Sequence, residues 1–299
     1  MGGKNVAKKY RSTKAGNVNT LLVESLDALG QVRYDADKTI KGKTLGLDLS
    51  VVLHKALGDI TSALEFQIQP PVPVSKIDDV LNKMILLFKR CDVKLLVCTE
   101  GKHHKYKGRV NEQRKKKQSG AQESVDKLVE QFKREPTSKL IDEIKKQMKY
   151  SVYVREDILA HAVDLLEENG IQVLSAPYEA DFQLVYWELM GITEGTITVD
   201  SDIFCLGSKL LVDNLSLQSK IGKCFLIEKK DVLDHNVLGS NTSSWSDNDL
   251  IIYLALCGCD FIRRLLGLKD EQITDFMKKW KKTSTRQEED SLLRKLCRD

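Results

Sequence analysis

The amino-acid sequence predicts an α/β fold in which a mostly parallel central sheet is flanked by helices. The spacing of the apolar residues leads to this prediction, and the length of the chain sets the size of the core. Short β-branched or apolar segments alternate with longer segments whose apolar residues recur every three or four positions, which is typical of strands alternating with helices. The chain has 299 residues, of which 41% are hydrophobic and 30% are charged. It is therefore long enough to bury one large core or two small ones.

The first expected strand is "TLGLDLS" at 44–50, and five similar segments follow it along the chain. Each is short and rich in apolar or β-branched residues, as strands are. These five segments are 93–98, 171–174, 196–199, 209–214 and 223–228. Helical spacing of apolar residues predicts helices over 74–91 and 155–170. The second of these ends at Gly170, where a glycine that caps a helix C-terminus belongs.

A charged stretch over 102–150 interrupts this alternation, and we expect it to be an excursion built of helices and punctuated by Pro136. Between Lys102 and Lys149 there are 15 Lys and Arg against 7 Asp and Glu, whereas the whole chain has a formal net charge of +4. The densest part is "KHHKYKGRVNEQRKKK". A solvated surface explains a single basic run, but clustered Lys and Arg also neutralise the phosphates of a polyanion.

Acidic residues follow three of the expected strands. Asp48 lies near the end of the first strand, Glu100 follows the second, and Asp200 and Asp202 follow "TITV". Because open α/β sheets place their sites at the carboxyl ends of the strands, these side chains are candidates for one site. A single Asp after a strand is also ordinary turn chemistry.

Three more acids extend this set. Glu179 and Asp181 lie in "SAPYEADFQL", where Pro177 at the first helical position indicates a helix start, and Asp260 closes "LIIYLALCGCDF". The helix dipole by itself favours acids in a first turn. It does not explain Asp48 and Asp260, because a charge within an apolar run is costly unless it is paired or bound to a metal.

Seven carboxylates in one place would in part stay protonated unless a cation neutralised them. Oxygen donors without His or Cys favour Mg²⁺ or Mn²⁺ over zinc. Together with the basic stretch, this predicts a phosphate-bearing substrate. Two metals about 3.5 to 4 Å apart would then hydrolyse a phosphodiester bond.

Other classes of protein fit less well. No apolar run reaches the roughly 18 residues of a membrane helix. The N-terminus "MGGKNVAKKY" lacks a secretory apolar stretch, so an intracellular protein without a membrane partner is expected. The seven cysteines are scattered, which fits reduced core thiols. Cys257 and Cys259 have no second pair at zinc-finger spacing.

The motifs "LGLDLS", "CTEGKHHKYKGRVNEQR", "APYEADFQLVY", "TVDSDIFCLGS" and "LALCGCDF" resemble, in order, those of the flap endonuclease / XPG family of structure-specific 5′-nucleases. The resemblance runs over about 40–275, and "LHKAL" after Asp48 is closest to the mismatch-repair 5′-exonuclease branch. It implies a PIN-like nuclease domain over 1–256 and a helix-two-turn-helix-like region over 257–299. The seven acids would be ligands of two Mg²⁺ ions, for which Mn²⁺ could substitute.

The same resemblance makes 102–150 a helical arch through which a 5′ strand passes. Lys107 and Arg114 match a basic pair that contacts the scissile phosphate, and at seven residues apart they would share one face of a helix. His54 would stack on a base near the cut, although a lone helix histidine is often only structural. The other expected nucleic-acid contacts are Lys102, Lys105, Arg109, Lys115, Lys116, Lys117 and Gly267.

Three features depart from the family pattern. Glu100 stands where the family usually has Asp, so the carboxylate reaches one methylene further. Lys269 follows Gly267 where a second glycine of a K⁺-binding turn belongs, and we expect weakened K⁺ and duplex binding there. The chain ends at Asp299, so a C-terminal partner-binding tail is expected to be short or absent.

These features predict a monomeric, Mg²⁺-dependent 5′-3′ exonuclease or 5′-flap endonuclease that acts on DNA in repair or replication. The resemblance to the family also implies a nuclear location. Two alternatives stay open. The chain is a catalytically weak or inactive nuclease-like module that binds nucleic acid or protein, or it is a nuclease that acts on RNA. The seven acids favour an enzyme, because a pure binding module has no need to crowd carboxylates beside a phosphate ligand.

Overall fold

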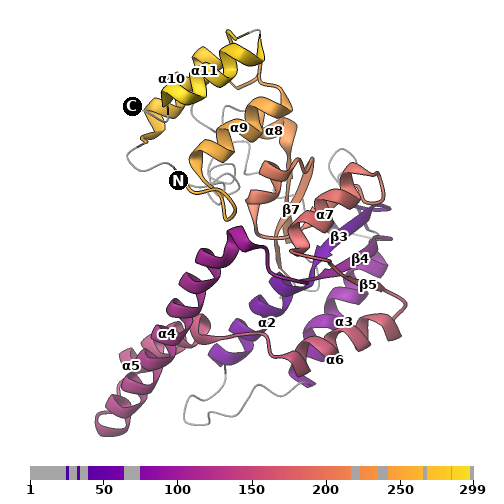
Figure 1. Ribbon diagram of the computed structural model, residues 1–299. Helices are drawn as coiled ribbons and strands as arrows, with labels where there is room; N and C mark the ends of the chain where they lie inside the picture. Colours follow the sequence, from indigo (N-terminus) through magenta and orange to yellow (C-terminus); the bar gives the residue numbers. More distant parts are fainter. Residues whose placement is uncertain are drawn as a thin grey trace. The chain divides into compact units, whose positions relative to one another are not determined.

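The computed structural model describes residues 25–26, 32–33, 40–63, 75–216, 223–234, 242–264, 268–283 and 285–296 (Figure 1). The chain forms two compact units. The first unit comprises Ile40–Gln183 and Leu217–Ile221, and the second comprises Met1–Thr39, Leu184–Ser216 and Gly222–Asp299. Helix α7 (Ala180–Leu189) carries the chain from one unit to the other.

Three parallel strands form the sheet of the first unit. They are β3 (Thr44–Asp48), β4 (Lys94–Thr99) and β5 (Gln172–Ser175), and β4 pairs with both of the others. In β3 the residues on both faces are buried, Leu45 and Leu47 on one face and Gly46 and Asp48 on the other. A strand buried on both faces requires covering helices, as the α/β prediction implies.

Helices α2 (Leu49–Ala63), α3 (Ser75–Arg90) and α6 (Glu156–Glu168) belong to the same unit. The buried residues Ile77, Leu81 and Phe88 form one face of α3, and α3 lies beside α6 (Figure 1). Gly170 follows α6 at φ 76°, and its N–H donates to the Glu167 carbonyl. This left-handed conformation is the one that the predicted C-terminal glycine supplies.

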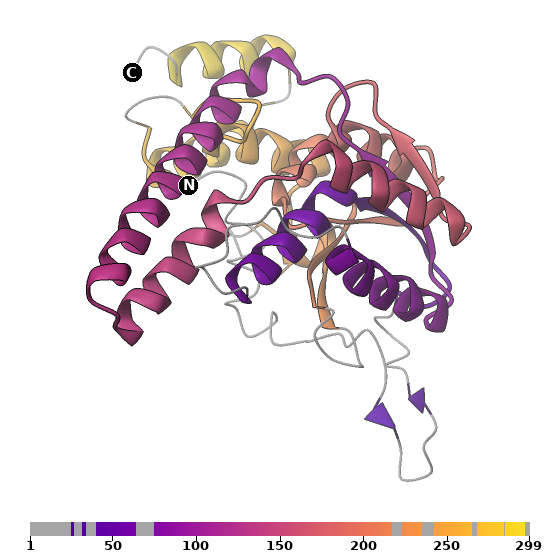
Figure 2. The same ribbon diagram turned by 90° about the horizontal axis from the view of Figure 1, so that it is seen from below.

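The charged excursion is helical, as predicted. A short 3-10 helix η3 (Lys105–Lys107) leads into α4 (Gly108–Arg134), which is followed by α5 (Ser138–Ser151). Figures 1 and 2 show α4 and α5 side by side as a hairpin. Its small core is built from Val125, Val129, Ile144 and Met148. Between the helices the Thr137 side chain accepts a hydrogen bond from the Leu140 N–H, which caps α5.

The second unit contains β6 (Gly195–Ile197), β7 (Leu210–Ser216) and β8 (Lys223–Glu228). β6 and β7 are parallel, and β8 returns antiparallel to β7. Six described strands therefore match the six predicted segments, with bounds that differ by at most two residues. The chain also has a short antiparallel pair, β1 (Ser25–Leu26) and β2 (Val32–Arg33).

The helices of this unit are η4 (Ser201–Leu206), α8 (Lys229–Asp234), α9 (Asp247–Cys257), α10 (Asp270–Trp280) and α11 (Arg286–Leu296). Phe204, Leu211, Leu254 and Met277 belong to one apolar core that joins η4, β7, α9 and α10. In the described part of the chain, no helix is both long and apolar enough to cross a membrane.

One local expectation changes. Pro177 is not the first residue of a helix, because α7 begins at Ala180. The carbonyls of Pro177 and Tyr178 instead accept hydrogen bonds from the N–H groups of Lys102 and Gly101, which holds this segment outside the helix. Gly267 lies outside the described residues, and Lys269 is the N-cap of α10 at φ −87°. The K⁺-binding turn stays a prediction.

Candidate active site

Asp48 ends β3 and is one of the buried acids of the first unit. Its side chain is 3% exposed. The Oδ1 atom accepts hydrogen bonds from the Ser50 N–H at 3.0 Å and from the Ser50 hydroxyl at 2.8 Å, which ties the carboxylate to the start of α2. Burial, and then the negative charge of Asp181, raise the pKa of Asp48 to about 7.

Glu100 follows β4 and points toward the start of α7. Its Oε2 atom accepts a hydrogen bond from the Ala180 N–H at 2.7 Å, a favourable place for an acid because a helix N-terminus carries partial positive charge. The next residue has to be glycine. A Cβ atom at Gly101 would lie 1.8 Å from the Ala176 carbonyl oxygen, so the β4 loop can approach the α7 loop only without a side chain there.

Glu179 and Asp181 lie at the start of α7, and both are buried. The Lys107 ammonium bridges them, with Nζ 2.6 Å from Asp181 Oδ2 and 3.1 Å from Glu179 Oε2. The other oxygen of Glu179 accepts the His104 N–H at 2.8 Å. A cation, here the ammonium of a residue 3% exposed, therefore already occupies the space between these two carboxylates.

The charges of this cluster act on one another. Burial opposes the charged form of Lys107, but the two carboxylates more than offset it and raise the pKa of the amine above its usual range. Burial, and to a smaller degree Asp181 and Glu179, raise the pKa of Glu100. The first unit thus gathers four of the predicted acids, Asp48, Glu100, Glu179 and Asp181, and two of them, Glu179 and Asp181, pair with the buried Lys107.

The structure places Lys107 and Arg114 in different surroundings, and their action as a pair on one phosphate stays a prediction. Lys107 is the last residue of η3, just before α4, and its side chain is turned into the acidic cluster by the two ion pairs. Arg114 lies on α4 and is exposed. His54 of α2 lies within electrostatic reach of Arg114, since partial desolvation of the ring and the positive charge of Arg114 lower the pKa of His54.

The other predicted basic contacts are exposed at the beginning of the hairpin. Lys102 and Lys105 lie in the segment before α4, and the rest lie in its first three turns. These remaining residues are Arg109, Lys115, Lys116 and Lys117. Their exposure leaves the ammonium and guanidinium groups accessible to phosphates, and their role in binding stays a prediction.

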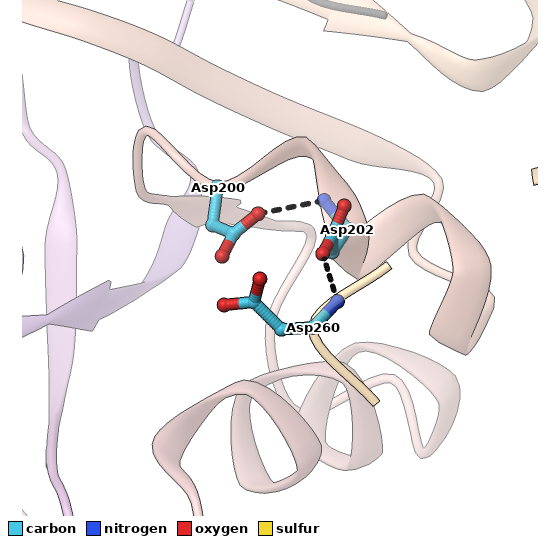
Figure 3. Close-up of side chains that lie close together, drawn as sticks. All are labelled: Asp200, Asp202 and Asp260. Atoms are coloured by element: carbon cyan, nitrogen blue, oxygen red, sulfur yellow. Dashed lines mark hydrogen bonds between the residues drawn. The ribbon is translucent and has the colours of Figure 1, made fainter. Parts of the chain in front are cut away.

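The remaining three acids form a second cluster, in the second unit (Figure 3). Asp200, Asp202 and Asp260 each offer an oxygen, and these oxygens lie within 4.8 Å of one another. Asp200 follows β6 and accepts the Asp202 N–H at 2.9 Å. Asp202 accepts the Asp260 N–H at 2.8 Å, so the segment after α9 is fastened to η4. Figure 3 shows the carboxyl groups of Asp200 and Asp260 facing each other.

Asp202 is the most buried acid of this second cluster. It is 1% exposed, and within the described residues its Oδ1 atom has no hydrogen-bond partner. Burial, and then the negative charge of Asp200, raise the pKa of Asp202 to about 8. A buried oxygen without a donor, beside two further carboxylates, is a natural ligand for a hard cation.

All seven predicted acids therefore belong to two clusters, four in the first unit and three in the second. Convergence of all seven on one metal pair stays a prediction. Sequence reasoning missed the contacts that build each cluster, such as the His104 N–H to Glu179 and the glycine at Gly101. It also missed the hydrogen bond of Cys205 with Cys259, which lowers the pKa of Cys259 to about 6. The alternation of aromatic and basic residues in "HHKYK" was an available signal for His104.

Comparison with known proteins shows which families and proteins the chain resembles. The family model described as XPG I-region matches residues 170–260. Exodeoxyribonuclease 1 of Schizosaccharomyces pombe is 27% identical over 242 residues, which cover 80% of this chain and 39% of the relative. Flap endonuclease 1 of Plasmodium vivax is 25% identical over 258 residues, covering 81% of this chain and 39% of the relative. The chain thus spans less than half the length of these curated relatives.

Solved structures show the same fold. The catalytic core of Rad2 in complex with DNA substrate has a TM-score of 0.53 at 19% identity, covering 87% of this chain and 73% of that one. Human GEN1 in complex with Holliday junction DNA has a TM-score of 0.50 at 19% identity, covering 80% of this chain and 50% of that one.

A mostly parallel sheet with flanking helices, a helical insertion after the second strand and acids at strand ends define a PIN-like fold of the nuclease type. More narrowly, residues 170–260 match the XPG I-region model, and the chain is similar to an exodeoxyribonuclease and to a flap endonuclease.

Proposed function

We propose that the protein is a metal-dependent 5′-nuclease that hydrolyses phosphodiester bonds in DNA with free 5′ ends or 5′ flaps, in DNA repair or replication. One observation carries the proposal. Seven carboxylates are gathered in two clusters, and the pKa values of Asp48 and Asp202 are raised by burial and by neighbouring acids. Such crowding is unfavourable unless cations are bound. The names of the relatives, an exodeoxyribonuclease and a flap endonuclease, support the same reaction.

The donors fit divalent cations of the Mg²⁺ type. Every candidate ligand is a carboxylate oxygen, and Asp202 Oδ1 is buried without a partner in the described part of the chain. One ion would be held by Asp200, Asp202 and Asp260, whose oxygens lie within 4.8 Å of one another. A second ion would be held by Asp48, Glu100, Glu179 and Asp181 once the Lys107 ammonium has left the space between Glu179 and Asp181. Bound divalent metals would supply a nucleophilic water at neutral pH and stabilisation of the leaving oxygen.

The basic residues of the first unit bind and orient the substrate. Lys107 holds a buried positive charge beside Glu179 and Asp181, where it would meet a substrate phosphate. Arg114 is exposed on α4 and lies within electrostatic reach of His54 on α2. A phosphate between these helices would gain charge-assisted hydrogen bonds from Arg114, while the neutral His54 ring is available to stack on a base.

The test is cleavage of a 5′-labelled double-flap DNA and of a duplex with a recessed 5′ end, each in Mg²⁺, in Mn²⁺ and in EDTA. We expect cutting only with metal, and the preferred substrate distinguishes flap cleavage from exonuclease action. Asp200→Asn should bind both DNAs and lower the cleavage rate by at least about 100-fold, as the loss of a group that acts on the transition state does. Asp164→Asn on α6, an exposed acid outside both clusters, is the matched control.

If the wild-type protein binds both DNAs and leaves them intact in Mg²⁺ and in Mn²⁺, a DNA nuclease is ruled out. The same labelled substrates made of RNA then separate an RNA-directed nuclease from a nuclease-like binding module. The monomeric state, a K⁺ ion near Gly267 and a nuclear location stay predictions.

A further inference from the structure

Four aromatic rings gather beside the acidic cluster of the first unit. His104 is at the centre, with ring centroids 4.9 Å from Tyr106, 6.1 Å from Tyr178 and 5.9 Å from Phe182. Two of the four come from the segment after β4, and the other two come from the start of α7 and the residues just before it. We call these four residues the aromatic platform.

The rings are too exposed for an ordinary core. Tyr106 is 61% exposed, Tyr178 is 52% exposed and Phe182 is 36% exposed. Single exposed apolar residues are common, but several large rings that contact one another at the surface indicate a binding site. An exposed ring offers a π-face to any planar group that reaches it.

The platform is held in place by the same contacts that build the acidic cluster. The backbone N–H of His104 donates to Glu179 at 2.8 Å, and the N–H of Gly101 donates to the Tyr178 carbonyl at 2.7 Å. These bonds join the two segments that carry the rings. A ligand would therefore meet surfaces that are already ordered, which reduces the entropic cost of binding.

The charge around the rings selects the ligand. Lys102 and Lys105 are exposed, and the Lys105 ammonium lies 5.2 Å from the centroid of the Tyr106 ring. The nearby acids Glu179 and Asp181 are buried and ion-paired with Lys107. A positively charged surface with interleaved aromatic rings fits a ligand that has planar groups on an anionic backbone, which is an unpaired nucleic-acid strand.

We propose that the aromatic platform binds unpaired nucleobases, with Tyr106 and Tyr178 as the stacking faces and Lys102 and Lys105 as the phosphate contacts. This site is separate from His54, and it rests on the proposed function only in that the strand is taken to be part of the substrate. It places unpaired nucleotides of that strand next to the carboxylates of the first unit.

The experiment compares two oligonucleotides that differ only in their bases. Fluorescence anisotropy measures the affinity of the full chain for labelled single-stranded dT and for an abasic strand of equal length, in EDTA so that no cutting occurs. Because the two strands have the same backbone charges, the difference between their affinities reports the contribution of base stacking. Tyr106→Leu with Tyr178→Leu keeps apolar bulk but removes both rings. We expect roughly tenfold weaker binding of the dT strand, as for the loss of a stacked base.

The abasic strand should bind the double variant as well as it binds the wild type. Tyr150→Leu with Tyr153→Leu, at positions 63% and 59% exposed, is the matched control and should change neither affinity. Equal weakening for both oligonucleotides, or none for the dT strand, overturns the proposal. A thermal melt verifies folding, and Tyr106→Leu alone serves as the test if the double variant melts early.

Failure of this proposal is distinguishable from failure of the nuclease function. Base-dependent binding without cleavage in Mg²⁺ would support the platform and exclude the nuclease. Cleavage without base-dependent binding would support the nuclease and exclude the aromatic platform.

Discussion

Asp48 and Asp202 are the residues whose energetics depend most on what surrounds them. Each ends or follows a strand and is almost fully buried. Their pKa values are raised from 3.8 to about 7 and about 8. An ordinary Asp in the unfolded chain ionises near pH 4. Folding therefore favours the protonated form of both side chains, and their ionisation works against the folded state.

A pH dependence of stability follows for the metal-free protein. Between about pH 4 and pH 8 the unfolded chain has released protons that folded Asp48 and Asp202 retain, so the contribution of these two groups to stability falls as pH rises and is constant above pH 8. In EDTA the melting temperature of Asp202→Asn should fall less between pH 5.5 and pH 8 than that of Asp164→Asn. Differential scanning fluorimetry measures both.

Metal should reverse this effect. Because binding requires ionised carboxylates, Mg²⁺ or Mn²⁺ should raise the melting temperature, with about 3 kcal/mol of stabilisation at 100 times Kd. In Asp202→Asn the rise should be smaller than in wild type. A full rise in that variant would contradict the assignment of Asp202 as a ligand.

At the scale of elements, the residues of the α4–α5 hairpin that pack its core are different from its basic residues. Its core is formed by Val125 and Val129 from the C-terminal half of α4 and by Ile144 and Met148 of α5. The basic residues 109–117 lie in the opposite, N-terminal part of α4. Lys115, Lys116 and Lys117 are exposed there, so they are available for phosphates at little cost to folding.

The basic part of α4 should therefore set the salt dependence of DNA binding. Replacement of Lys115, Lys116 and Lys117 by Gln should reduce the slope of log K against log salt by about 0.7 to 0.9 for each phosphate that the variant no longer neutralises. Anisotropy titrations at several salt concentrations measure the slope.

A second triple variant controls for the change of net charge. Lys139, Lys145 and Lys146 all lie on α5, and their replacement by Gln removes the same three charges from a different helix. Its slope should stay close to that of the wild type. Equal slopes for the two triple variants would exclude a specific role for the basic part of α4.

The helices and strands were predicted correctly where they depend on apolar spacing within one segment. A helix start was predicted wrongly where hydrogen bonds to a distant segment decide the conformation. The strands and the helices α3 and α6 follow from apolar spacing, and Gly170 marks a helix end as predicted. Pro177 favoured an earlier start of α7, but hydrogen bonds to the segment after β4 keep Pro177 and Tyr178 outside the helix. The sequence also did not show that the Lys107 ammonium is paired with carboxylates far along the chain, one of them 74 residues away.

For the whole molecule, the division of the acids between two compact units has a functional consequence. The first unit supplies Asp48 and three other carboxylates, and the second supplies Asp202 and two others. If hydrolysis requires both clusters, removal of the acids of either cluster abolishes activity.

Two single variants and their combination test this requirement. Asp48→Asn and Asp202→Asn should each lower the cleavage rate at least about 100-fold, and the double variant should be little worse than either, because groups that act as a unit are strongly non-additive. Single-turnover cleavage of the preferred DNA substrate measures all three. Multiplicative losses would mean that the clusters act independently.

The sequence by itself determined the order of the elements and the position of each acid at or near the end of an element. Both depend on local periodicity and on residues adjacent in the chain. Only the tertiary structure decided which groups meet. Asp260 donates its N–H to Asp202, 58 residues away, and His104 donates its N–H to Glu179, 75 residues away. Such contacts depend on how the whole chain folds back on itself, and no pattern among neighbouring residues encodes them.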